Sequence, residues 1–218
     1  MLRSSSGILP FELTYCSMDE LLNYLRLFAT LSDSDAGCLG HHVREVSLAR
    51  DDYFLDVNEI PGTIGFVKCG VLRAGCYDSR GATVVKRFIE EGHFISDAYR
   101  LGGRPSQEFV QAVTDSRLLT LSAESVSLMP ALIDGWDVLM ARVALTILRE
   151  RQNWGHSWIG VDATSRYLAF DRIHPGLTDR IGLGNVASCL GMSASTLSRI
   201  RTSQRQCSTI NYPHNTGG

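Results

Sequence analysis

Six polar residues near the end of the chain have types that could recognise a nucleic acid from a single helix. They combine short hydroxyl side chains with long cations, and they are Ser193, Ser195, Thr196, Ser198, Arg199 and Arg201. Hydroxyls can bond phosphates or base edges, and an arginine fork can bind guanine O6 and N7 together. The pattern predicts a face that enters the DNA major groove, with Ser195, Ser198 and Arg199 at base edges and with Thr196 and Arg201 at phosphates.

The residues around this face predict the two helices that would position it. A first helix over 183–190 places apolar side chains on one side, and Gly191 supplies the positive φ of a tight turn. A second helix follows, with Ser193 as its N-cap. The residues predicted to fill the core shared by the two helices are Val186, Ala187, Leu190, Met192, Leu197 and Ile200. The segment therefore has the spacing of a helix-turn-helix, although an ordinary helical hairpin with a solvated face would share this pattern.

The composition fits an ordinary globular protein whose charge is unevenly distributed. The 218 residues are 44% hydrophobic and 20% charged, with a formal net charge of −2. Residues 161–218 hold six arginines and three aspartates, a net charge of +3, which leaves −5 for the remainder. The basic excess thus coincides with the predicted DNA-binding face, as contacts to phosphates require.

Neither the cysteines nor the apolar segments indicate a metal site or a membrane protein. The six cysteines contain no CxxC pair, which disfavours zinc and iron–sulfur ligation and predicts reduced thiols. No apolar run approaches the roughly 20 residues that span a bilayer, and residues 1–16 lack the apolar stretch of a secretory signal. We expect no metal, no membrane association and a cytoplasmic location.

The rest of the chain changes periodicity twice. Residues 18–39 have helical spacing, and 43–121 form short β-rich runs broken by turn residues, typical of an antiparallel sandwich or roll. Residues 92–107 are the least strand-like part and predict a loop with at most one helical turn. A second helical region then predicts one helix of about seven turns. Its apolar stripe consists of Leu132, Trp136, Leu139, Val143, Ile147, Glu150, Trp154 and Trp158.

This narrow stripe predicts a homodimer, because a seam against an identical helix would bury it. Packing on the chain's own β domain is the alternative, and both can occur on different faces of one helix. Past Gly160, a further helix over 162–173 is expected to end at His174-Pro175-Gly176. Residues 204–218, polar and ending in a Gly pair, predict a disordered tail.

The order of these elements over residues 20–203 resembles the Crp/Fnr family of bacterial transcription regulators. The motifs that carry the resemblance are DATSRYLAFDRIHPGL, RIGLGNVASCLGMSASTLSRIR and FVKCGVLRAGCYDSRGATVVKRFIEEGHFI. The resemblance implies an α+β fold with an antiparallel, jelly-roll-like and cupin-like β-roll (a double-stranded β-helix) flanked by helices. The implied domains are a cyclic-nucleotide-binding-like effector roll over 1–128, a dimerisation helix over 129–160 and a DNA-binding helix-turn-helix over 161–203.

The resemblance also locates an effector site in the loop before the last strands. Family members that bind cyclic nucleotides have a Gly-Glu pair for the ribose and an Arg-Ser pair for the phosphate. Those positions read Ser96-Asp97 and Ser106-Gln107 here, with Arg104 two residues upstream. We therefore expect no binding of cyclic AMP in the usual way, and no cofactor is evident. A cyclic nucleotide held through Asp97 and Arg104, another small molecule, or no ligand remain the open alternatives.

The implied function is a sequence-specific, double-stranded-DNA-binding transcription regulator that acts as a homodimer, with RNA polymerase as a further partner. A sensor whose C-terminal helices contact a protein instead of DNA is the alternative. Enzymatic activity is not expected, because His156 beside Ser157 and Asp97 near His93 lack an accompanying nucleophile elbow, phosphate loop or metal-spaced ligand set. The family's usual glutamate on the reading helix is Ser195 here, which predicts a different base preference.

Overall fold

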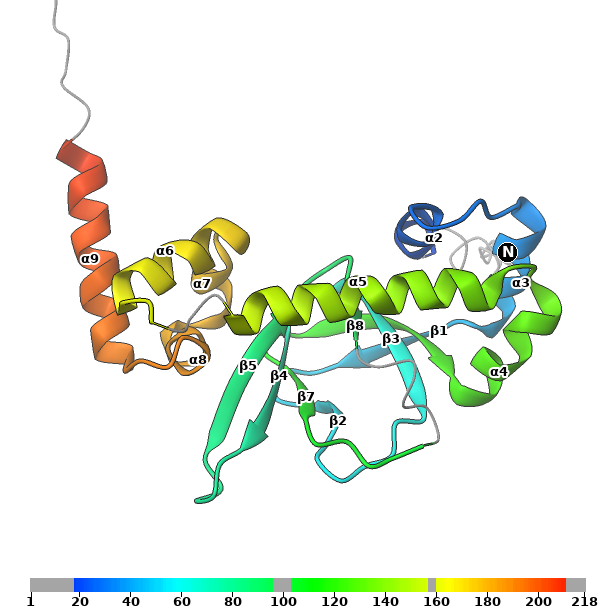
Figure 1. Ribbon diagram of the computed structural model, residues 1–218, viewed down its shortest axis with the longest axis horizontal. Coiled ribbons are helices and arrows are strands. Elements are labelled where there is room, and N and C mark those ends of the chain that lie inside the picture. Colours follow the sequence, from blue (N-terminus) through cyan, green and yellow to red (C-terminus); the bar gives the residue numbers. More distant parts are fainter. Residues whose placement is uncertain (1–17, 96–102, 157–159, 211–218) are drawn as a thin grey trace, which may run out of the picture. The chain divides into compact units, whose positions relative to one another are not determined.

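The computed structural model describes residues 18–95, 103–156 and 160–210, and they form a mixture of helices and antiparallel sheets (Figure 1). The chain divides into two compact units. Residues 1–74 and 88–150 make up unit 1, and residues 75–87 and 151–218 make up unit 2. The predicted α+β class with a jelly-roll-like β-roll is confirmed.

Two four-stranded sheets make up the roll. One has the order β1-β8-β3-β6 and the other β2-β7-β4-β5. The strands are β1 (Arg44–Leu48), β2 (Tyr53–Leu55), β3 (Thr63–Cys69), β4 (Leu72–Tyr77), β5 (Thr83–Ile89), β6 (Phe94–Ile95), β7 (Phe109–Ala112) and β8 (Ser116–Ser122). The periodicity predicts all of them except β6, which pairs Ile95 with Gly65 and Phe94 with Phe66 inside the segment expected to be a loop.

The first sheet has two apolar faces, because successive side chains of a strand point to opposite sides. On β3, Val67 faces the interior of the roll with Leu72, Val110 and Leu118. Phe66 faces the other way, into a core formed with the helices. The inner strands β3 and β8 are thereby buried on both sides, whereas β1 at the edge is largely exposed.

The helices of unit 1 cover the second of these faces. They are α2 (Asp19–Arg26), α3 (Asp33–His42), α4 (Ala123–Leu132) and the part of α5 (Trp136–His156) up to residue 150. A capping box begins α3, since the Ser32 hydroxyl accepts from Asp35 N at 3.1 Å and the Asp35 carboxylate accepts from Ser32 N at 2.9 Å. These helices share one core with the sheet through residues such as Leu25, Leu39 and Met129.

Gly70 between β3 and β4 has a φ of +102°, where its backbone passes close to β8. A Cβ atom at this position would lie 2.2 Å from Ser116 Oγ and 2.7 Å from the Asp115 carbonyl oxygen. Both the conformation and the space therefore require glycine. Gly70 fixes the sharp reversal that brings β4 into the opposite sheet.

The predicted single long helix is wrong at its start, because residues 133–135 divide it. Gly135 has a φ of +74° and separates α4 from α5. Leu132 consequently belongs to α4 and is 49% exposed, whereas Trp136, Leu139 and Val143 on α5 are buried in the core of unit 1. The side chains of Glu150, Trp154 and Trp158 lie outside the described part of the structure.

Unit 2 contains a bundle of α-helices. They are α6 (Ala163–Ile173), α7 (Leu177–Ile181), α8 (Leu183–Cys189) and α9 (Ala194–Ile210). As predicted, α6 ends before His174-Pro175-Gly176. The predicted tail is wrong for residues 204–210, which continue α9. This part of α9 has no Gly or Pro to interrupt it, because the next proline is Pro213.

Candidate nucleic-acid interface

Helices α8 and α9 meet at a tight turn whose centre is Gly191, with a φ of +62°. Ala187 is 2% exposed at the point where the helices approach each other, and its carbonyl accepts from Met192 N at 3.0 Å. Leu197 on α9 is fully buried and anchors its inner face. The predicted pair of helices and the turn are present. Four of the six predicted core residues are buried, whereas Met192 and Ile200 are only half-buried.

The N-terminus of α9 is capped by a cluster of hydroxyls. Ser193 Oγ accepts from Thr196 N at 3.1 Å. The same oxygen lies 2.9 Å from Ser195 Oγ and 2.8 Å from Thr196 Oγ1. The predicted N-cap is therefore confirmed, and it also orients the two neighbouring hydroxyls.

We expect Ser193→Ala to open the first turn of α9, because the Thr196 amide loses its acceptor. Loss of such a cap costs about 1 kcal/mol, or roughly fivefold in a local opening equilibrium. Hydrogen-exchange mass spectrometry of the full chain should show faster exchange in peptides covering 194–198. Ser193→Asp, which keeps an acceptor, is the control, and equal protection in Ser193→Ala would contradict the capping role.

The outer face of α9 carries the predicted base-reading residues. Ser195, Ser198 and Arg199 are exposed. Positions 195, 198, 199 and 202 lie on one side of a helix with 3.6 residues per turn. Thr202 shares this side, but its hydroxyl donates to the Ser198 carbonyl at 3.0 Å. The available groups are therefore one arginine fork and two short serines.

Arg201, which the sequence placed at a phosphate, turns toward α7 instead. Its Nη2 lies 2.5 Å from Asp179 Oδ1, and its side chain is only 16% exposed. Arg205 Nη2 lies 3.8 Å from the same carboxylate oxygen. Asp179 was not predicted as a functional residue. Its signal in the sequence is an acidic residue two helices before two arginines that are spaced four apart.

Helix α6 is fixed by its own cap and by aromatic packing. Asp162 Oδ1 accepts from Thr164 N at 2.9 Å and from Ser165 N at 3.1 Å. A hydrogen bond from the Ser165 side chain is the main cause that holds the pKa of Asp162 below its usual value. Tyr167 and Phe170 on this helix are buried. Helix α6 packs against α9.

The predicted effector residues are only partly within the described structure. Ser96 and Asp97 lie outside it. Arg104 and Gln107 are exposed, whereas Ser106 is only 6% exposed. Ser106 Oγ donates to the Glu108 carbonyl at 2.6 Å, and its backbone bonds Asn58 and Glu59. Ser106 is thus occupied in holding the loop at 56–59, which is a structural role.

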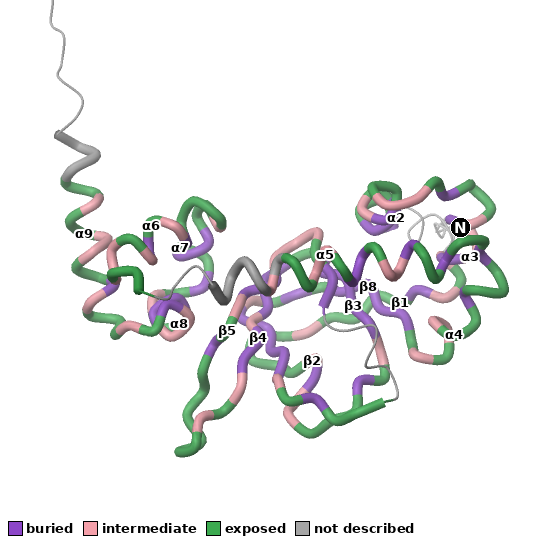
Figure 2. The backbone as a smooth tube through the Cα atoms, viewed as in Figure 1, coloured by how far each residue is buried: buried purple, intermediate pink, exposed green. Residues whose placement is uncertain are grey.

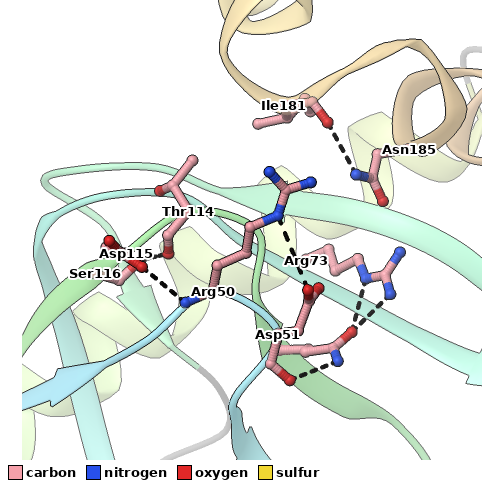
Figure 3. A network of polar contacts seen from close by, with 9 residues as sticks. Arg50, Asp51, Arg73, Thr114, Asp115, Ser116, Ile181 and Asn185 are labelled. Atoms are coloured by element: carbon pink, nitrogen blue, oxygen red, sulfur yellow. Dashed lines mark hydrogen bonds and ion pairs between the residues drawn. The ribbon is translucent and has the colours of Figure 1, made fainter.

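The second sheet of the roll holds a different cation. Arg73 donates to Gln111 Oε1 through Nε at 3.0 Å and through Nη2 at 2.6 Å, while Gln111 Nε2 donates to the Asp51 carbonyl at 2.8 Å (Figure 3). Arg73 also lies 5.9 Å from the centre of the Phe109 ring. Nearby, Arg50 N donates to Asp115 Oδ1 at 2.9 Å. The bonds of Arg73 and Gln111 tie β4 and β7 to the turn that precedes β2.

The described residues contain no group of three or more His, Cys, Asp or Glu side chains that could hold a metal ion. Cys38, Cys69, Cys76 and Cys189 are free thiols. No helix within the described ranges is both long and apolar enough to cross a membrane.

Comparison with solved structures identifies the fold. FixK2 from Bradyrhizobium japonicum is 16% identical, with a TM-score of 0.65 over 81% of this chain and 89% of that one. The c-di-GMP-responsive regulator CLP from Xanthomonas campestris is 14% identical, with a TM-score of 0.62 over 80% and 93%. The catabolite activator protein of Thermus thermophilus is 16% identical, with a TM-score of 0.51 over 83% and 86%.

No family model and no curated protein sequence matches the chain. The neighbours are Crp/Fnr family regulators with cyclic-nucleotide-binding domain folds. The resemblance that the sequence motifs indicated is confirmed at the level of the fold.

Proposed function

We propose that this chain, which has the fold of Crp/Fnr family regulators, is a sequence-specific DNA-binding transcription regulator that acts as a homodimer. The observation that carries the proposal is the outer face of α9. It presents Arg199 between Ser195, Ser198 and Thr202 on an exposed helix that contains no acidic residue. Such a face is small enough to enter the major groove and has one cation suited to guanine.

The capped end of α9 would approach the DNA backbone. Backbone amides at a helix N-terminus attract anions, and the hydroxyls of Ser193 and Thr196 lie beside them. Phosphate contacts would fix the register while Arg199 reads a base. Two such helices related by a dimer axis would bind half-sites about one helical turn, ~34 Å, apart.

The dimer would form through the outer face of α5. Val138, Leu145 and Leu148 are 57%, 53% and 46% exposed, although Leu139 and Val143 of the same helix are buried. Buried and exposed positions alternate along this part of α5 (Figure 2). Together with Ala141, the three exposed residues repeat at spacings of three and four residues, which is the pattern of a coiled-coil seam. The predicted stripe packs within the chain from Trp136 to Ile147, so the proposed seam lies on the other side of the helix.

The roll would act as a sensor or scaffold that does not bind cyclic AMP in the usual way. The position that would hold the cyclic phosphate has Ser106 turned to the Glu108 carbonyl and Gln107 exposed. No fixed cation replaces the missing arginine at these two positions. RNA polymerase is the partner that such a regulator would engage at a promoter.

Fluorescence anisotropy with genomic fragments, including the gene's own upstream region, tests this proposal. We expect tight binding at low salt that weakens as salt rises, because each neutralised phosphate contributes about −0.9 to the slope of log K against log salt. Cyclic AMP should change neither the affinity nor the slope.

Two other results of this experiment would contradict parts of the proposal. Binding that requires cyclic AMP would contradict the interpretation of Ser106 and Gln107. A complete absence of salt-sensitive DNA binding would contradict the proposed function and favour a protein partner for α9. The ion pairs of Arg201 and Arg205 with Asp179 give that alternative some support, because they reduce the charge available to DNA.

A further inference from the structure

Two of the three arginines on α9 converge on a single carboxylate. Arg201 Nη2 is 2.5 Å and Arg205 Nη2 is 3.8 Å from Asp179 Oδ1 on α7. The exposed fractions differ, since the Arg201 side chain is 16% exposed and those of Asp179 and Arg205 are 67% and 73%. Arg201 is therefore enclosed at the junction of two helices, while Arg205 adds charge from outside.

Helix geometry separates these two arginines from the third. At about 100° per residue, Arg199 points roughly 200° away from Arg201, whereas Arg201 and Arg205 share one side. The three arginines thus divide between an outer face and an α7-facing side. A change in the ion pair would rotate or tilt α9 and move Arg199 with it.

We infer that Asp179 and Arg201 form a clamp that sets the orientation of α9, and that Arg201 itself makes no contact with DNA. Both are positioning residues, and they act through Arg199 and the neighbouring serines. The inference rests on the proposed function and deepens it, because it assigns Arg199 to DNA recognition and Arg201 to the positioning of α9.

The surroundings of Arg201 support this assignment. The buried Tyr167 of α6 lies close enough to Arg201 to act on its charge, so α6, α7 and α9 all contribute to the surroundings of this one side chain. The hydrogen bond from Arg201 holds the pKa of Asp179 below its ordinary 3.8. The contribution of the ionised carboxylate to folding stability is present above pH 3.8 and is lost only as the pH falls through the lowered pKa. The ion pair is therefore charged at neutral pH. A DNA phosphate would have to displace Asp179 before it could pair with Arg201.

The direction in which Asp179→Asn changes DNA affinity distinguishes a clamp from a phosphate contact. Asp179→Asn makes the protein more positive and frees Arg201, so a phosphate-binding Arg201 would then bind DNA more tightly. A clamp predicts the opposite. We expect Asp179→Asn and Arg201→Gln each to weaken binding to a specific site about fivefold, with the double variant no weaker than either single one.

Non-specific DNA supplies the second readout, because its binding depends on phosphate contacts alone. Arg201→Gln should change affinity for non-specific DNA less than about twofold and leave the salt slope unchanged, whereas loss of a phosphate contact would reduce the slope by about 1 per protomer. Arg205→Gln, which removes an exposed cation from the same side of α9, is the matched control. It should leave specific binding within about twofold, because Arg205 is the more distant partner.

A charge-reversed pair guards against simple misfolding. Asp179→Arg combined with Arg201→Asp should recover part of the specific affinity that either single reversal loses. Tighter DNA binding by Asp179→Asn, a reduced salt slope in Arg201→Gln, or no recovery in the reversed pair would overturn the clamp.

Failure of the clamp can be distinguished from failure of the proposed function. Wild-type protein that binds no DNA would contradict the function, and the clamp would still be measured by hydrogen exchange in the full chain. Asp179→Asn should then accelerate exchange in peptides covering 177–181 and 198–206. Unchanged exchange there would overturn the clamp independently of any DNA measurement.

Discussion

Replacing Leu145 with aspartate is expected to convert the protein into a monomer and to weaken binding to a two-half-site operator at least about 100-fold. Leu145 lies at the centre of the exposed apolar row on α5 and is 53% exposed in the single chain. A carboxylate there would have to be buried without a partner in the proposed seam. Once the dimer separates, each reading helix binds alone and the gain from joining two half-sites, about 10²–10⁴, is lost.

Sedimentation equilibrium and operator anisotropy together measure this result. The matched control is Ile60→Asp, which places the same charge at an apolar side chain that is 56% exposed elsewhere in unit 1. Ile60→Asp should remain dimeric and bind DNA normally. An unchanged mass for Leu145→Asp, or an equal loss in the control, would exclude the α5 row as the seam.

Removal of the Arg199 guanidinium is expected to lower specific DNA binding by about 1–3 kcal/mol and to flatten base preference at one position in each half-site. Arg199 is the arginine of α9 that does not turn to Asp179, and α9 contains no carboxylate to read cytosine. Discrimination should therefore depend heavily on this one fork. Arg199→Ala should bind non-specific DNA almost as well as the wild type does.

A set of operators with each base pair changed in turn measures this effect. Arg199→Lys is the informative control, since it keeps the charge but loses the bidentate geometry. It should retain the affinity for non-specific DNA and lose the preference at the same position. If both variants keep the wild-type preference, Arg199 does not read a base.

Much of the fold could be predicted because its signals are local. Strand alternation, the glycine turn at Gly191 and the serine cap at Ser193 each arise from residues within a few positions. The short strand β6 was missed, since two residues carry no periodicity and Phe94 and Ile95 are held by pairing with β3. The strand conformation of β6 thus depends on its pairing with a distant strand and has no local signal in the sequence.

The candidate site was harder to predict, because side-chain direction depends on packing between helices. Thr196 and Arg201 have the right types for phosphate contacts, yet Thr196 bonds Ser193 and Arg201 bonds a residue 22 positions earlier. The stripe on α5 had the correct period, but its strongest members bury themselves in their own chain. When a helix has apolar residues on two faces, the sequence shows a single periodic pattern. The structure is needed to tell which residues face the chain's own core and which face outward.

The two outer surfaces, on α5 and on α9, belong to different units of the chain. Under the proposed function, a substitution that impairs one surface need not impair the other. A copy that lacks Arg199 would still pair with a normal copy, and the mixed dimer would have only one α9 helix able to recognise its half-site. Such an allele would be dominant over the normal gene. A copy that carries aspartate at position 145 would pair with nothing, and its allele would be recessive.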